Sequence, residues 1–160
     1  MTASVRDRDS IRAELIQLSL PAIVLLLFDG TASRSELAYR CESPHKSLTR
    51  GSALPRPLIP LWECGTIVTA FDSLDRSFCK LSLEAPREYW FSGVSFDGVI
   101  ADLMIDLWED ELSETALSEM ADLMEFARWQ QLASELERGP NGDYHAWRTA
   151  LRENRPFSAP

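Results

Sequence analysis

Four short apolar segments in the middle of the chain constrain its fold most strongly. Turns of only a few residues separate them, and they are rich in β-branched, aromatic and aliphatic side chains, which is typical of strands. They cover Leu58–Glu63, Thr66–Asp72, Phe78–Leu83 and Tyr89–Ser92. A parallel sheet needs crossover connections of a dozen or more residues between its strands. The short links therefore predict an antiparallel meander of about four strands.

Helices are expected before the meander. Asp9 or Ser10 can cap a first helix, and Ser19 offers an N-cap for a second one that contains the apolar run Ile23–Phe28. Gly30 stands where a left-handed residue would end this helix. Beyond it the pattern weakens. A short helix is possible over Ser35–Cys41, and a long connecting loop is predicted after it up to residue 57, since this stretch holds Pro44, Gly51, Pro55 and Pro57.

Helices are expected after the meander as well. Ser95 caps one, and Ser113 or Thr115 starts the next. Helical patterns continue over Arg128–Arg138 and Asp143–Glu153, with Gly139-Pro140 between them. This order predicts an α+β fold in which N-terminal helices precede a central antiparallel meander and the C-terminal helices pack on one sheet face.

The length of 160 residues suits one domain. We expect a single domain over 1–160, with a core at about 10–138 and a helical C-terminal extension at 139–160. The apolar run Leu18–Phe28 is far shorter than the roughly 20 residues that a membrane-spanning helix needs. Three cysteines form no CxxC pair, which favours reduced thiols. The chain is therefore predicted to be a cytoplasmic protein that does not bind membranes.

The net charge of −9 is unevenly distributed along the chain. Residues 1–96 hold 11 acidic and 11 basic side chains, whereas residues 97–137 hold 12 acids and one base, and residues 138–160 hold two acids and four arginines. A nucleic-acid-binding surface needs a basic footprint, which is missing here. A cationic protein would suit the acidic segment.

Sequence motifs for catalysis are missing. The chain contains no GxSxG, GxxxxGK[ST], GxGxxG or HExxH pattern. A nucleophile–base pair of Cys64 and His45 remains an open but weak alternative. No spacing of histidine and cysteine indicates a metal site, so we expect neither a metal nor another cofactor. The sequence predicts a protein that is not an enzyme.

The predicted helix after Ser95 carries an acidic stripe that includes Asp102, Asp106 and Glu109. Like charges at i, i+4 repel, and acids near a helix C-terminus oppose the helix dipole. A cationic partner would offset both effects, so these residues are candidate partner-binding residues. Two alternatives stay open: the stripe serves solubility alone, or it is neutralised by arginines that fold back from the tail, namely Arg148, Arg152 and Arg155.

Aromatic side chains of the meander form a second candidate surface. Successive residues of a strand point to opposite faces, so some aromatic residues in this region must point outward if helices cover one face. Exposed aromatic side chains beside a polar rim are common in protein interfaces. Trp62 and Trp90 are the candidate partner-binding residues here.

Several short motifs resemble the SUKH superfamily. Leu20-Pro21 followed by an apolar helix and Asp29-Gly30 is similar to the family's opening, Ile59–Asp72 looks like its central strand pair, and Ser95-Phe96 matches the start of its closing helix. The resemblance implies an α+β domain with one antiparallel sheet and no catalytic residues. Many bacterial members are immunity proteins that neutralise toxins, and others are regulatory scaffolds. An immunity protein against a basic, nuclease-type toxin is the first expectation, and a regulatory or scaffold domain is the alternative.

Overall fold

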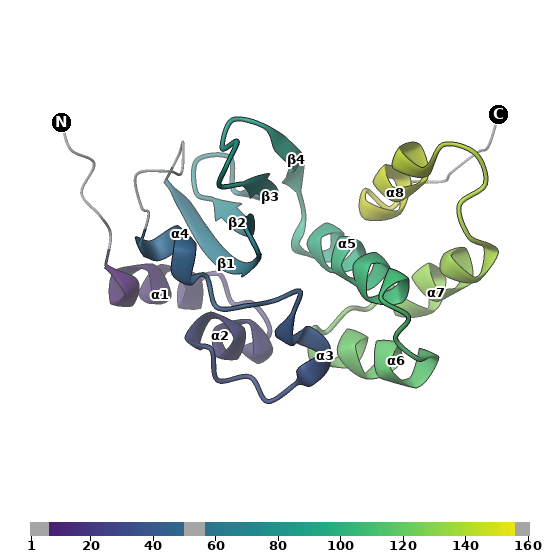
Figure 1. Ribbon diagram of the computed structural model, residues 1–160, viewed down its shortest axis with the longest axis horizontal. Coiled ribbons are helices and arrows are strands. Elements are labelled where there is room, and N and C mark those ends of the chain that lie inside the picture. Colours follow the sequence, from purple (N-terminus) through teal and green to yellow (C-terminus); the bar gives the residue numbers. More distant parts are fainter. Residues whose placement is uncertain (1–6, 50–56, 156–160) are drawn as a thin grey trace. The chain divides into compact units, whose positions relative to one another are not determined.

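The computed structural model describes residues 7–49 and 57–155 (Figure 1). By its internal contacts the chain divides into two compact units, residues 1–93 and residues 94–160. The first unit holds the N-terminal helices and the sheet, and the second holds helices. Each unit is described by itself.

The sheet of the first unit is the predicted meander. Its strands β1 to β4 follow one another in sequence order, and β1 pairs antiparallel with β2 and β2 with β3. Their bounds are Leu58–Cys64, Ile67–Asp72, Ser77–Ser82 and Tyr89–Val94. The tight turn at Gly65 has a positive φ of 60°, which glycine adopts at little cost. Both the α+β class and the antiparallel topology are confirmed.

Both faces of strand β1 are buried. Its register against β2 shifts between Pro60 and Trp62, which marks a bulge. Helices α1 (Arg8–Gln17), α2 (Ala22–Asp29) and α4 (His45–Thr49) all contact it (Figure 1). This cover explains why six successive residues of the strand are buried.

The caps of α1 and α2 differ from those predicted. Asp7, and not Asp9 or Ser10, caps α1 by accepting a hydrogen bond from Ser10 N at 2.8 Å. The Ser19 cap is wrong, because Ser19 has a φ of 53° and follows the end of α1, while α2 begins after Pro21 without a side-chain cap. Gly30 ends α2 in the left-handed conformation, as predicted.

The loop predicted up to residue 57 contains structure in its described part. The possible short helix before it is present as α3, Ser35–Ala38, and within the predicted loop itself lies α4. The carboxylate of Glu63 in β1 accepts hydrogen bonds from Lys46 N at 2.8 Å and from the Ser47 hydroxyl at 2.7 Å. Glu63 therefore caps α4 from a distant strand, which no local pattern reveals. Residues 50–56 of the predicted loop lie outside the described residues.

The second unit is built around helix α5, Phe96–Glu109. It contacts α6 (Glu114–Leu123), α7 (Trp129–Arg138) and, most extensively, α8 (Tyr144–Arg152) (Figure 1). Ser95 and Ser113 cap α5 and α6 as predicted. The described part of the predicted extension is not an appendage, because α8 packs on α5 and buries Trp147 to 1% exposure. Among the described residues, no helix has the length and apolar character that crossing a membrane requires.

Helices α5 and α6 both end in a Schellman motif that has a glutamate at its left-handed position. Glu111 after α5 and Glu125 after α6 have φ values of 64° and 52°. The following amides close the motifs, with Leu112 N donating to Leu107 O at 3.2 Å and Phe126 N donating to Ala121 O at 2.9 Å. Glycine is the favoured residue at this position, so each glutamate adds backbone strain.

Glu111→Gly and Glu125→Gly should each raise the free energy of unfolding by about 1 kcal/mol, because glycine relieves the left-handed strain. Urea denaturation followed by circular dichroism measures the change. Glu119→Gly removes the same charge from the interior of α6 and should instead lower stability by roughly 1 kcal/mol. Equal effects at all three positions would contradict the assignment of strain.

Candidate functional site

Two acids of the predicted binding stripe are buried inside the second unit. Asp102 is 3% exposed and Asp106 is 8% exposed. Residues 98–107 of α5 are all buried, so this helix is the centre of the unit and has no solvent-facing side there. The expectation that Asp102 and Asp106 face solvent is wrong.

Two arginines of α8 neutralise these carboxylates. Arg148 donates from Nε to Asp102 Oδ1 at 2.9 Å and from Nη2 to Asp106 Oδ1 at 2.7 Å. Arg152 donates from Nη1 to Asp102 Oδ1 at 3.1 Å. The two arginines are spaced i, i+4 on α8, as the two aspartates are on α5, so one turn of each helix faces one turn of the other. The alternative in which tail arginines fold back is therefore confirmed for Arg148 and Arg152.

The surroundings of Arg148 keep it charged. Burial lowers its pKa, but hydrogen bonds and the negative charges of Asp102 and Asp106 outweigh this effect and raise the pKa above its ordinary value. Arg148 Nη1 also donates to the Tyr144 hydroxyl at 3.0 Å. That hydroxyl donates to Glu109, and burial together with this bond raises the pKa of Tyr144.

Arg148→Met should lower the free energy of unfolding by about 3–5 kcal/mol, because both buried carboxylates lose their ion pair with Arg148 and only Asp102 keeps its pair with Arg152. The quadruple variant Asp102→Asn, Asp106→Asn, Arg148→Met, Arg152→Met should recover most of this loss, since it removes both arginines together with both carboxylates and leaves no uncompensated charge of the network buried. Chemical denaturation of the three proteins at pH 7 measures both effects. A loss below about 1 kcal/mol in Arg148→Met would contradict a structural role of the network.

The other predicted residues do not form one site. Glu109 is exposed at the end of α5, and its carboxylate lies 3.7 Å from Arg148 Nη1. Trp62 is 3% exposed and belongs to the core of the first unit, so the expectation of an outward position is wrong for it. Trp90 on β4 is 61% exposed, and Lys80 Nζ lies 5.3 Å from the centre of its ring.

An acidic surface on α6 was not singled out by the sequence. Glu114, Glu119 and Asp122 are exposed on this helix, and the exposed Glu111 and Glu125 flank it. We call these five residues the α6 acidic surface. With 14 acidic and five basic side chains, residues 94–160 carry the whole net charge of −9. The charge count contained this signal, but it could not separate the exposed acids from the buried pair.

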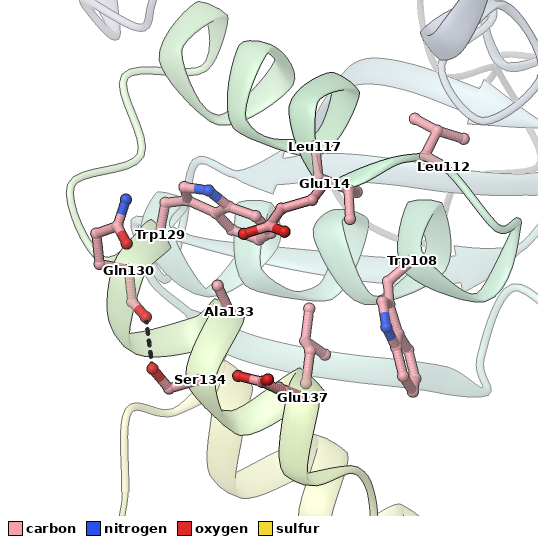
Figure 2. Close-up of a pocket in the computed structure, with 10 residues that line it drawn as sticks. Trp108, Leu112, Glu114, Leu117, Trp129, Gln130, Ala133, Ser134 and Glu137 are labelled. Carbon is pink, nitrogen blue, oxygen red and sulfur yellow. Dashed lines mark hydrogen bonds between the residues drawn. The ribbon is translucent and has the colours of Figure 1, made fainter.

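A cleft of about 430 Å³ lies between the C-terminal end of α5, the start of α6 and α7. Figure 2 shows Trp108, Trp129, Glu114, Glu137 and Ala133 among the residues that line it. The rest of its lining is Leu112, Leu117, Gln130, Ser134 and Leu136. Sequence reasoning missed this cleft, because its walls come from three helices.

Within residues 7–49 and 57–155, no group of three or more histidine, cysteine, aspartate or glutamate side chains is placed to hold a metal ion. The three cysteines are free, with Cys41 and Cys79 buried and Cys64 partly exposed. His45 is exposed on α4, and no hydrogen bond between described residues joins it to Cys64. The geometry gives no support to a nucleophile–base pair.

No protein-family model matches the chain, and comparisons with curated proteins and with solved structures find no match. The resemblance to the SUKH superfamily thus stays a prediction. What the molecule itself offers for a functional argument is the α6 acidic surface, the neighbouring cleft and the exposed Trp90.

Proposed function

We propose that this protein is a non-enzymatic protein-binding protein whose second unit docks a cationic partner through the α6 acidic surface. The specific form that we propose, from the resemblance to the SUKH superfamily, is an immunity protein that neutralises a basic, nuclease-type toxin. The observation that carries the proposal is that the exposed side of α6 has three acids and no base, in a unit that holds the entire net charge.

Electrostatics favour this surface as an interface. A concentrated negative field attracts a positively charged protein and accelerates its association, which an inhibitor of a toxin needs. The same field repels nucleic-acid phosphates, so the partner should be a protein. The buried Asp102 and Asp106 contribute little to this field, because Arg148 and Arg152 neutralise them locally.

The backbone positions of two flanking acids also support the proposal. Glu111 and Glu125 stand at left-handed positions just after helix C-termini, where both the backbone and the helix dipole disfavour them. A cationic partner would offset the electrostatic part of this cost. Residues that lower stability at a surface are frequent where function requires them.

The alternative function is a regulatory or scaffold domain in a larger assembly. One observation favours it: the first unit has its own exposed aromatic residue, Trp90, on the edge strand β4. A scaffold would use surfaces on both units, whereas an immunity protein of the proposed kind needs only the acidic one. The substitution Trp90→Ala distinguishes the two functions, because a scaffold should lose the partner that binds the first unit, whereas an immunity protein should keep its toxin.

The test of the proposed function compares two matched variants. Glu111→Gln, Asp122→Asn, Glu125→Gln removes three charges from the α6 acidic surface, and Asp9→Asn, Glu84→Gln, Glu88→Gln removes three exposed charges from the first unit. Each immobilised protein captures partners from extract of its native cell, and mass spectrometry identifies them. We expect the wild type and the first-unit variant to retain a basic protein that the α6 variant loses at least tenfold and that elevated salt releases.

Expression of the captured protein completes the test. An immunity protein predicts that this partner arrests growth when it is expressed alone and that co-expression of the wild-type chain restores growth. An acidic partner, equal capture by both variants or no specific capture would each refute docking on the α6 acidic surface. A basic partner without toxicity would favour the scaffold.

A further inference from the structure

The cleft between α5, α6 and α7 combines aromatic walls with two acids. Trp129 is 8% exposed, and Trp108 is partly exposed, so their rings form lining and not protrusions. Figure 2 shows Glu114 and Glu137 among the residues that line the cleft, and they come from the start of α6 and from the last turn of α7. The volume of about 430 Å³ lies in the range of sites that enclose a small group.

Both carboxylates are available to a ligand. Glu114 and Glu137 are exposed, and neither forms an ion pair with another residue in the described part of the chain. The nearest cation along α7, Arg138, pairs instead with Glu135 at 2.6 Å. The dipole of α5, which ends at the cleft, is opposed by that of α6, which begins there, so the negative potential comes from the two carboxylates. An anion is therefore disfavoured here, and a cation is favoured.

We infer that this cleft receives an arginine side chain of the cationic partner, between Trp108, Trp129, Glu114 and Glu137. This inference rests on the proposed function and names the recognition element within it. A guanidinium group is flat and weakly hydrated, so it stacks on an indole and donates to carboxylates at the same time. Its aliphatic stem can pack on apolar side chains of the lining, which include Leu112, Leu117 and Ala133.

Neighbouring contacts hold the walls of the cleft in place. The centre of the Trp108 ring lies 6.2 Å from the centre of the ring of Trp147. Trp147 belongs to α8 and is buried in the core of the unit. The Ser134 hydroxyl donates to Gln130 O at 3.1 Å and so does not occupy the cleft as a free donor (Figure 2). A site with fixed aromatic walls loses little conformational entropy when it binds a side chain.

A titration with capped arginine tests the inference directly. The protein is labelled with ¹⁵N-tryptophan, and the indole N–H resonances of Trp108 and Trp129 are followed as N-acetyl-arginine methylamide is added. We expect saturable shifts of these two resonances, at least fivefold weaker binding in Glu114→Gln, Glu137→Gln, and unchanged binding in the control Glu84→Gln, Glu88→Gln, which removes two exposed charges from the first unit. The uncharged analogue N-acetyl-citrulline methylamide should cause no saturable shift.

Other outcomes overturn the inference. Equal shifts with the citrulline analogue would show that the site is apolar. Tighter binding of spermidine than of the arginine analogue would show a site for a free polyamine. If neither indole resonance shifts, the cleft does not bind cations. The captured partner separates this inference from the proposed function. If Glu114→Gln, Glu137→Gln binds the partner normally while the α6 variant does not, the arginine site is refuted and the docking surface stands. If neither variant affects the partner, the proposed function itself fails.

Discussion

The second unit depends on the ion-pair network that joins α8 to α5. Arg148 contacts Asp102 and Asp106 at once, and Arg152 contacts Asp102, so four buried or partly buried charges neutralise one another. The backbones also come close: a side chain at Gly98 would place its first carbon 2.9 Å from Arg152 O. A buried ion pair adds little net stability compared with apolar packing. Removal of one partner is nevertheless strongly destabilising, because it leaves the other charge buried without compensation. The network therefore fixes the register in which α8 packs on α5.

This internal neutralisation divides the acids of the chain into two groups with different roles. Asp102 and Asp106 belong to the structure, and their charges cancel within the unit. The acids of the α6 acidic surface are exposed to solvent. A count of charges along the sequence merges the two groups, and only the second can attract a partner at long range.

Local patterns in the sequence were sufficient for most of the fold but not for long-range contacts. Short links predicted the meander, and the caps at Ser95 and Ser113 were correct, because these features depend on neighbouring residues. The position of Asp102 depends on α8, about 46 residues further along, and α4 depends on Glu63. The matching i, i+4 spacings of the aspartates and arginines were the signal that could have revealed the network. No comparable signal existed for the cleft, whose walls meet only after three helices have packed.

The network also bears on the cleft, through α8. Arg148 and Arg152 hold α8 against α5, and this places Trp147 at 6.2 Å from Trp108 between ring centres. Trp108 in turn lines the cleft. If the cleft receives an arginine of the partner, as we propose, the buried charges contribute to recognition without touching the partner, because they keep an aromatic wall in position before binding. Preorganisation of this kind lowers the entropic cost of association. Asp102 and Asp106, which the sequence placed at the interface, would then act one layer beneath it.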